Sequence, residues 1–375
     1  MREKLLRLLQ KHLFTILSSI TFGEWLKLLD KNDFSVDVVY WPRANLITFG
    51  SILNSYLAWK EQRIFGPVLD KVEVLPPLFI LGYWRTGTTH LHNLLALDPT
   101  FAFPNNCQVA YPKTFLSTEA LIAPWMDRWL PQHRLQDNMR LRVDMAQEDE
   151  FALFTATSFS PYTAWVFPRN ERHYERYLTF RGVPTQELEC WKQAFIQFLK
   201  KLTWKYQKPL LLKSPPHTCR IKLLLEMFPQ ARFVHIHRDP YRVFQSTKHT
   251  TLTAGPAFAL QRRNLKWLDD GILRRYRILY DAFFEERSLI SVGRYHDVRF
   301  EDLERDPLGQ VELLYEKLRL PGFAAMRPAL EKYVGSLAGY RKNTLPDLAP
   351  GLRERVAREW RRSFEEWGYS QDSKA

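Results

Sequence analysis

The sequence contains little cysteine and no residue pattern typical of a metal site. Its three cysteines, Cys107, Cys190 and Cys219, lie far apart in a chain of 375 residues. No CxxC pair occurs, so neither a zinc site nor a disulfide framework is predicted. None of the ten histidines belongs to an HExxH motif. We therefore expect a cytoplasmic protein that works in a reducing compartment and needs no metal.

The N-terminal region lacks an apolar run long enough to cross a bilayer. From Leu5 to Leu29, the longest stretch without an ionisable residue is Leu13 to Gly23, whereas a spanning helix needs about 20 apolar residues. A small-x-small cleavage site is also missing after this stretch, which argues against a secretory signal. We expect an amphipathic helix that packs on the core. The alternative is peripheral membrane contact through this N-terminal helix.

Positive charge, by contrast, is in excess. Lys and Arg number 54 against 41 Asp and Glu, which gives a net charge of +13. Such a charge favours a polyanionic partner, for example a nucleotide, an acidic glycan or an anionic membrane. Since no nucleic-acid-binding motif accompanies the charge, we do not expect a nucleic-acid partner. One alternative rests on charge alone, namely a non-catalytic module that binds polyanions.

Short apolar segments predict an α/β fold. The segment from His217 to Phe228 has helical apolar spacing and lies between two such strands, which makes a strand-helix-strand unit and hence a parallel sheet. We expect one domain over residues 1–375, with a parallel sheet flanked by helices. The strands are predicted at 77–82, 209–213, 231–237 and 289–292. The predicted parts are a helical extension (1–75), a core (76–303) that holds a helical insertion (100–205), and C-terminal helices (304–375). We expect the insertion to lie over the carboxyl edge of the sheet, where ligands bind in open α/β folds.

The first strand runs into a turn suited to an anion. The turn and the helix that follows contain Arg85, Thr86, Gly87, Thr88 and Thr89. A helix start offers unpaired N–H groups and a positive dipole end to a phosphate or sulfate. Gly87 lets the backbone approach the anion, Arg85 supplies a forked cation, and the threonine hydroxyls can donate.

The same turn resembles a P-loop but lacks its lysine. Gly82 and Gly87 have the glycine spacing of a Walker A loop, and the chain carries Thr88 where the essential lysine stands in that motif. The fold is therefore P-loop-like. A kinase or NTPase with a degenerate loop is the alternative reading, and the missing lysine speaks against it.

Two further polar groups follow the next strands. Arg238 comes directly after strand 231–237, where Asp239 and Pro240 are suited to start a helix, and Ser246 lies eight residues after Arg238. Lys213 ends strand 209–213. A cation at the carboxyl edge of a sheet can stabilise a departing oxyanion.

Together these motifs resemble the sulfotransferases that use 3′-phosphoadenosine 5′-phosphosulfate (PAPS), in the bacterial-type branch that includes tyrosylprotein sulfotransferases. The resemblance runs from Pro76 to Leu303. It implies PAPS as co-substrate and in-line transfer of a sulfuryl group to a hydroxyl or amine. It also implies that the turn at 85–89 holds the 5′-phosphosulfate, that Arg238 and Ser246 hold the 3′-phosphate, and that Lys213 assists the leaving phosphate.

Two departures from the family pattern concern the nucleotide. Phe300 stands where the family has a tyrosine in its Tyr-Glu-Asp-Leu segment, so a hydrogen bond from that tyrosine to the adenine is not expected. Arg341 and Lys342 are similar to an Arg-Lys-Gly element of cytosolic relatives, but Asn343 replaces the glycine.

The general base has two candidates. Glu150 closes an acidic triplet before an apolar segment, and His217 follows Lys213 by four residues, close to where cytosolic relatives keep a Lys-x-His base. If neither serves, His90 after the phosphate turn is the next candidate. We expect a small-molecule, glycan or lipid acceptor, and the sequence makes no prediction of oligomeric state.

Overall fold

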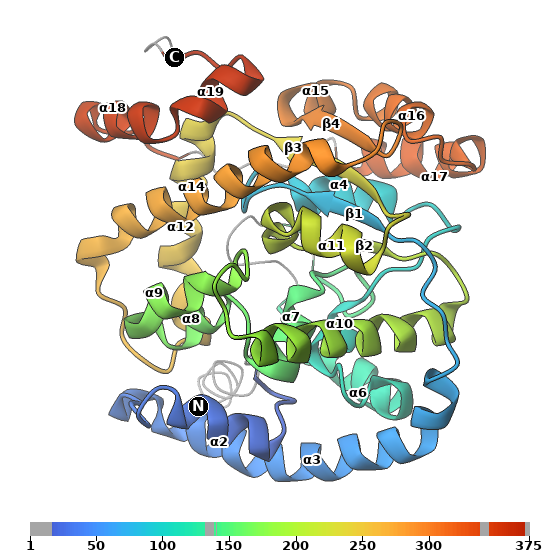
Figure 1. Ribbon diagram of the computed structural model, residues 1–375, viewed down its shortest axis with the longest axis vertical. Coiled ribbons are helices and arrows are strands. Elements are labelled where there is room, and N and C mark those ends of the chain that lie inside the picture. Colours follow the sequence, from blue (N-terminus) through green and yellow to red (C-terminus); the bar gives the residue numbers. More distant parts are fainter. Residues whose placement is uncertain (1–16, 132–138, 140, 338–344, 372–375) are drawn as a thin grey trace. The chain divides into compact units, whose positions relative to one another are not determined.

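The computed structural model describes residues 17–131, 139, 141–337 and 345–371, and these form two compact units (Figure 1). Unit 1 comprises the described residues of 1–75, 103–208 and 253–264, and unit 2 those of 76–102, 209–252 and 265–375. The predicted N-terminal extension and most of the predicted insertion therefore belong to the same unit. That the insertion lies over the sheet edge stays a prediction. A search of the described residues finds no helix with the length and apolar character of a membrane span.

Unit 2 is built on a four-stranded parallel sheet with the order β2-β1-β3-β4. In register, Phe79 of β1 is opposite Leu212 of β2 and Phe233 of β3. The Phe79 and Phe233 rings stack with centroids 5.5 Å apart. The strands are β1 (Leu78–Leu81), β2 (Leu211–Lys213), β3 (Arg232–His237) and β4 (Tyr295–Arg299). The predicted α/β class with a parallel sheet is thus confirmed.

Helices connect and cover the strands of unit 2 (Figure 1). Strands β1, β2 and β3 are almost wholly buried, as expected for a parallel sheet between helical layers. A short 3₁₀ turn over Pro215–Cys219 precedes α11, where the sequence predicts one helix from His217 to Phe228. The helices are α4 (Thr88–Leu95), α11 (Ile221–Met227), α12 (Pro240–Thr253), α14 (Leu268–Glu286), α15 (Phe300–Arg305), α16 (Pro307–Lys317), α17 (Phe323–Ser336), α18 (Pro350–Glu359) and α19 (Arg361–Trp367).

The fourth predicted strand was wrong in position. Leu289 ends a 3₁₀ turn and Val292 is fully exposed. The strand lies at 295–299 instead, at the edge of the sheet, where only Val298 is buried. An edge strand with one buried side chain lacks the continuous apolar run by which an inner strand is predicted.

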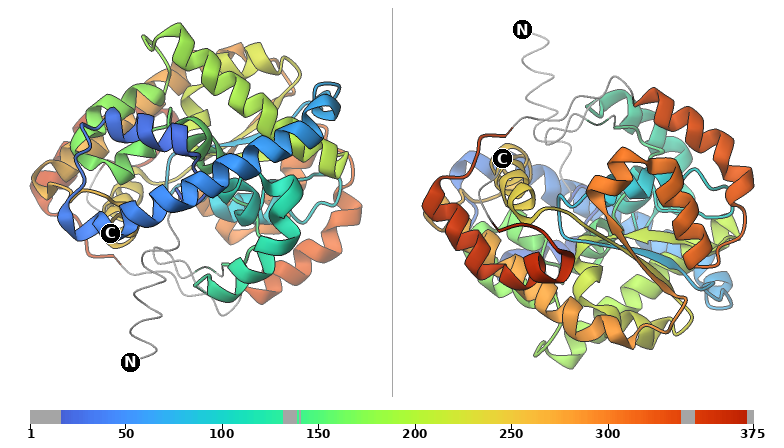
Figure 2. Two further views of the ribbon diagram at one scale, coloured as in Figure 1. Left: turned by 90° about the horizontal axis from the view of Figure 1, so that it is seen from below. Right: turned by 90° about the horizontal axis from the view of Figure 1, so that it is seen from above.

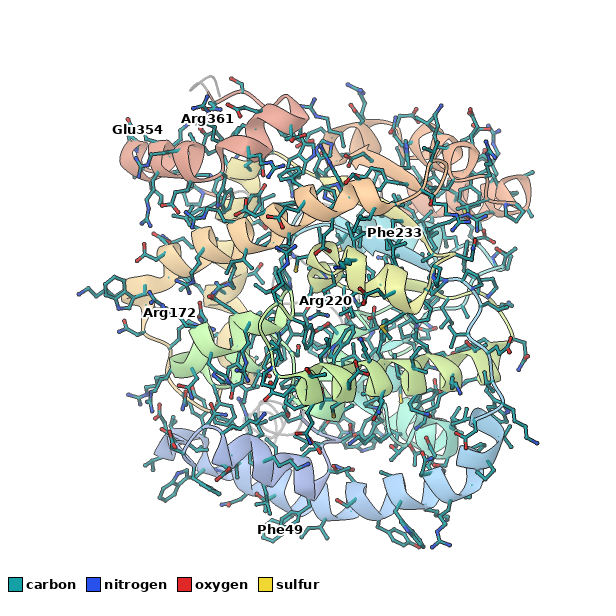
Figure 3. The ribbon with its side chains drawn as sticks, in the orientation of Figure 1. Phe49, Arg172, Arg220, Phe233, Glu354 and Arg361 are labelled. Atoms are coloured by element: carbon teal, nitrogen blue, oxygen red, sulfur yellow. The ribbon has the colours of Figure 1, made fainter. Side chains whose placement is uncertain are left out.

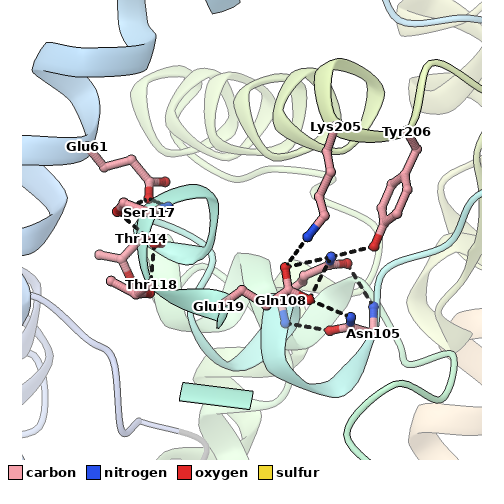
Figure 4. A network of polar contacts seen from close by, with 9 residues as sticks. All are labelled: Glu61, Asn105, Gln108, Thr114, Ser117, Thr118, Glu119, Lys205 and Tyr206. Atoms are coloured by element: carbon pink, nitrogen blue, oxygen red, sulfur yellow. Dashed lines mark hydrogen bonds and ion pairs between the residues drawn. The ribbon is translucent and has the colours of Figure 1, made fainter. Parts of the chain in front are cut away.

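Unit 1 is helical, and buried polar contacts join its helices (Figure 4). The Gln108 amide nitrogen and Lys205 both donate to Glu119, at 3.1 and 2.5 Å. The same amide nitrogen donates to the Tyr206 hydroxyl at 2.6 Å. The helices are α2 (Phe22–Asp30), α3 (Trp41–Leu69), α5 (Asn106–Ala110), α6 (Phe115–Trp129), α7 (Glu150–Thr157), α8 (Thr163–Val166), α9 (Glu171–Tyr174), α10 (Thr185–Tyr206) and α13 (Gly255–Phe258).

The structure describes only the second half of the segment in which the N-terminal amphipathic helix is predicted. Residues 5–16 of that segment lie outside the described residues, and α2 covers Phe22–Asp30. Within α2, Trp25 and Leu28 are buried. The Trp25 indole nitrogen donates to Thr48 of α3 at 2.8 Å, so this part of the helix packs on its own unit as expected.

Candidate active site

The turn between β1 and α4 has a backbone that requires glycine. Gly82 has φ 146° and Gly87 has φ 103°, and both values lie in the left-handed half of conformational space. A Cβ at Gly82 would lie 2.6 Å from the Ile236 carbonyl oxygen, and one at Gly87 would overlap the Phe300 ring. Arg85 also has a positive φ, 75°. The turn is therefore held in one tight conformation by its neighbours.

The start of α4 is suited to receive an anion. Gly87 is the N-cap residue of the helix, and it has no side chain with which to cap the first N–H groups. Thr88 opens the helix, and it is buried, as is Thr86. The Thr86 hydroxyl donates to the Tyr83 carbonyl at 2.8 Å and so braces the turn itself. Backbone N–H groups and a positive helix end together favour a phosphate or sulfate, so the anion site stays a prediction.

Three cations follow three neighbouring strands of the sheet. Lys213 ends β2, Arg85 follows β1, and Arg238 follows β3. Arg85 Nε donates to Ser246 Oγ at 2.9 Å, and Arg238 Nη1 donates to the Arg85 carbonyl oxygen at 3.4 Å. Lys213 Nζ donates to Thr89 Oγ1 at 3.4 Å. The structure thus brings together the predicted residues of both nucleotide loops and the predicted leaving-group lysine.

Arg238 packs against Phe300, the first residue of helix α15, which follows β4. Its guanidinium lies 4.2 Å from the centroid of the Phe300 ring, a cation–π arrangement. Burial lowers the pKa of Arg238, and the Glu301 carboxylate partly opposes this shift. Arginine titrates so far above neutral pH that its charge is kept. Phe300 therefore contacts both loops, because the same ring lies against Gly87.

The helix after Arg238 begins as the sequence predicts. Asp239 accepts a hydrogen bond from the Arg242 backbone N–H at 3.1 Å, and α12 starts at Pro240. Ser246 lies on this helix and is buried. The cap fixes the direction of α12, and this direction sets the position of the Ser246 hydroxyl relative to the Arg85 side chain.

Among the candidate bases, His217 lies in the core of unit 2. Its ring is fully buried and packs edge-on against Phe79, with centroids 5.3 Å apart. This packing favours a structural role. His90 lies in the first turn of α4, next to Thr89, and is half-buried.

Glu150 belongs to unit 1. It is the first residue of α7, is fully buried, and accepts a hydrogen bond from Ser160 Oγ at 2.7 Å. The neighbouring Glu148 accepts one from the Tyr162 hydroxyl. The carboxylate is thus fixed within its own unit, and its role as base stays a prediction.

Sequence reasoning missed one basic residue near the loop. Arg275 of α14 hydrogen-bonds Tyr83, and burial lowers its pKa while Tyr83 opposes the shift. No local pattern marks Arg275, since its partner is far away in the sequence. Arg341 and Lys342 lie outside the described residues. A search of the described residues finds no group of three or more His, Cys, Asp or Glu side chains placed to hold a metal ion.

Comparisons with known proteins identify the family of this chain. The model of the sulfotransferase family matches residues 76–325. The chain is 38% identical over 349 residues to the omega-hydroxy-beta-dihydromenaquinone-9 sulfotransferase Stf3 of Mycobacterium bovis, which covers 93% of this chain and 89% of that protein. The same protein of Mycobacterium tuberculosis matches with the same values.

Solved structures share the fold at low sequence identity. The sulfotransferase STF1 from Mycobacterium tuberculosis has a TM-score of 0.66 at 18% identity and covers 90% of both chains. The sulfotransferase STF9 from Mycobacterium avium has the same TM-score and identity, and covers 93% of this chain and 96% of its own. The family match and the Stf3 identity decide against the kinase-like and the non-catalytic alternatives. This chain belongs to the sulfotransferase family.

Proposed function

We propose that this sulfotransferase takes its sulfuryl group from PAPS and transfers it to an alcohol hydroxyl of a lipid-soluble menaquinone-type acceptor. One observation carries the donor assignment: Arg85 contacts both Ser246 and Arg238, which come from a distant segment of the chain. A ligand with anionic groups at both ends of a nucleoside matches two linked anion sites. The glycine geometry of the turn and the helix start that follows it support the phosphosulfate end.

The reaction needs charge neutralisation on the leaving group. The acceptor oxygen attacks sulfur in line, the bond from sulfur to the bridging oxygen breaks, and adenosine 3′,5′-bisphosphate departs with its electron pair. Lys213 and Arg85 supply positive charge where this negative charge grows. The N–H groups at the start of α4 hold the non-reacting oxygens. A base takes the proton of the attacking hydroxyl.

The acceptor proposal rests on the Stf3 relatives. Their name gives an omega-hydroxylated dihydromenaquinone as the substrate, and the match to this chain extends over most of both proteins. An alcohol of that kind is weakly acidic, so its proton must be removed as the sulfur–oxygen bond forms. We therefore retain a general base in the mechanism and keep Glu150 and His217, both buried, as its candidates.

The donor is tested by calorimetric titration with adenosine 3′,5′-bisphosphate. We expect tight binding that does not change when a chelator removes divalent ions. ATP should compete only weakly for the same site. Binding that requires magnesium, or that prefers ATP, would contradict the donor assignment.

The acceptor and the base are tested in one transfer assay. Radiolabelled PAPS is supplied with an ω-hydroxylated dihydromenaquinone, a simple phenol or a sugar, and we expect label on the hydroxylated dihydromenaquinone. Glu150→Gln should lose more activity with the alcohol than with the phenol, which gives up its proton more easily. If neither Glu150→Gln nor His217→Ala shows this acceptor dependence, His90 becomes the candidate base.

A further inference from the structure

The two faces of α3 are reversed relative to an ordinary surface helix. Side chains that are large and apolar or aromatic point outward, and Phe49, at 73% exposure, is the most exposed of them (Figure 3). They recur at the spacing of one helical face. We name this the α3 apolar face, and it consists of Leu46, Phe49, Ile52, Leu53, Tyr56 and Trp59.

The buried face of α3, in contrast, is mostly polar. Arg43 donates to the Ala259 carbonyl at 2.7 Å, and the Asn54 amide donates to the Ser18 and Ile20 carbonyls at 2.9 and 3.2 Å. Glu61 accepts hydrogen bonds from the Ser117 backbone and hydroxyl at 2.8 and 2.6 Å (Figure 4). An amphipathic helix normally buries its apolar stripe. Here α3 is anchored by polar contacts, and its apolar stripe remains outside.

The neighbouring helix extends this surface. Helix α2 runs alongside α3 (Figure 2), and the Phe22 backbone N–H donates to Ser55 Oγ at 2.9 Å. Phe22 and Leu26 of α2 are themselves exposed. Contiguous apolar patches of this kind on soluble proteins mark surfaces that bind something.

The residues at one end of the stripe indicate which partner it binds. From Ala44 to Trp59 the sequence holds no Asp, Glu, Lys or Arg, and then Lys60 and Arg63 follow, both exposed. The Tyr56 and Trp59 rings stack at 6.0 Å, and the Arg63 guanidinium lies 5.1 Å from the Trp59 ring centroid. Apolar side chains bordered by Trp, Tyr and cations are typical of a helix at the boundary of lipid headgroups and acyl chains.

We propose that the α3 apolar face docks on the surface of a lipid bilayer. The helix lies in the plane of the interface, Phe49 and Leu53 enter the acyl region, and Tyr56 and Trp59 lie at headgroup level. Lys60 and Arg63 contact lipid phosphates, so anionic lipids are preferred. This inference goes beyond the proposed reaction and depends on neither the donor nor the acceptor.

The test is co-sedimentation of the full chain with phospholipid vesicles. One set contains phosphatidylcholine with phosphatidylglycerol, and the other phosphatidylcholine alone. We expect the wild-type chain to pellet with both, and more with the anionic set. Phe49→Glu with Leu53→Glu should lower partition at least about tenfold, because two carboxylates replace two inserted apolar groups. Lys60→Gln with Arg63→Gln should remove the preference for the anionic set.

Leu121→Glu is the matched control. Leu121 is 80% exposed on α6 of the same unit and is not on the α3 apolar face, so this variant should pellet like the wild type. Circular dichroism and binding of adenosine 3′,5′-bisphosphate should be unchanged in all variants, which separates this test from that of the donor.

Three results would overturn the proposal. The first is a wild-type chain that stays in the supernatant with both vesicle sets. The second is a Phe49→Glu, Leu53→Glu variant that pellets as well as the wild type. The third is a wild-type dimer, seen by sedimentation velocity, that the same double variant converts to monomer without any change in vesicle binding. That result would assign the face to a second copy of the chain.

Discussion

Two buried lysines, one in each unit, contact different kinds of side chain. Lys201 of α10 in unit 1 lies 2.7 Å from the Glu61 carboxylate of α3, and both are almost fully buried. Burial lowers the pKa of Lys201, and Glu61 opposes that shift. Lys213 of unit 2 is also buried, and its ammonium group donates to the Thr89 hydroxyl at the start of α4.

The two lysines differ in where they lie. Lys201 and Glu61 form an ion pair between two helices of unit 1. Lys213 lies at the end of a strand, beside the helix start at which we predict an anion site. A buried cation next to further donors favours an added anion. Burial alone therefore does not identify a functional lysine.

The strongest test exchanges the two lysines for alanine. Lys213→Ala should lower turnover by ~10²–10³-fold, because a preorganised charge is lost where the leaving group develops its own. Lys201→Ala should lower the free energy of unfolding by about 3–5 kcal/mol, because Glu61 is left buried without its partner. Steady-state kinetics and chemical denaturation of both variants measure the two effects.

The same comparison has an internal control. Replacing both partners, Lys201→Met with Glu61→Gln, should recover much of the lost stability. If Lys213→Ala instead loses stability and keeps its turnover, the two lysines have been assigned the wrong way round.

The next test concerns the loop that carries Arg238. Replacing Arg238 and Ser246 together with alanine should abolish the preference for adenosine 3′,5′-bisphosphate over adenosine 5′-monophosphate. Hydrogen bonds to a charged group are worth about 1.5–3 kcal/mol each, so the bisphosphate should bind at least about tenfold more weakly. The monophosphate serves as the control, and calorimetry gives both affinities. A preference that survives would place the 3′-phosphate elsewhere.

The parts of the site that the sequence predicts are those set by local patterns. The glycine turn before α4 and the Asp239 cap before α12 depend on neighbouring residues, and both are present in the structure. The edge strand β4 was misplaced, because Tyr295, His296 and Asp297 do not form an apolar run. The role of Glu150 depends on contacts between segments far apart in the chain, which no local pattern encodes.

The α3 apolar face has a signal in the sequence. The uncharged run from Ala44 to Trp59 is longer than the run from Leu13 to Gly23 in the N-terminal segment for which membrane contact was the alternative prediction. Its helical periodicity predicts one apolar face but not whether that face points inward. The direction is set by Arg43, Asn54 and Glu61, whose polar contacts come from distant segments.

His237 is a third buried basic side chain, and folding keeps it uncharged. Burial lowers its pKa to about 4 from 6.5, and the Asp297 carboxylate opposes the shift. Between these values the unfolded chain binds a proton that the folded chain does not, so stability falls as pH falls. We expect a loss of about 1 kcal/mol from this residue between pH 7 and pH 5.5. Urea denaturation across that range should show a smaller slope in His237→Gln, and an equal slope in both proteins would exclude His237 as the source.

The smallest expected effect concerns Arg238. Its guanidinium lies over the Phe300 ring, whereas the Lys201 ammonium lies against the Glu61 carboxylate. Phe300→Leu keeps an apolar side chain but removes the ring beneath the guanidinium. A cation–π contact of this kind is worth about 0.5–1 kcal/mol, so adenosine 3′,5′-bisphosphate should bind about threefold more weakly. Phe300→Tyr keeps the ring and should bind like the wild type. Adenosine 5′-monophosphate should bind all three proteins equally, because the ring positions only the cation for the 3′-phosphate. If Phe300→Leu weakens both nucleotides to the same extent, the ring supports the whole turn through Gly87 and not Arg238 in particular.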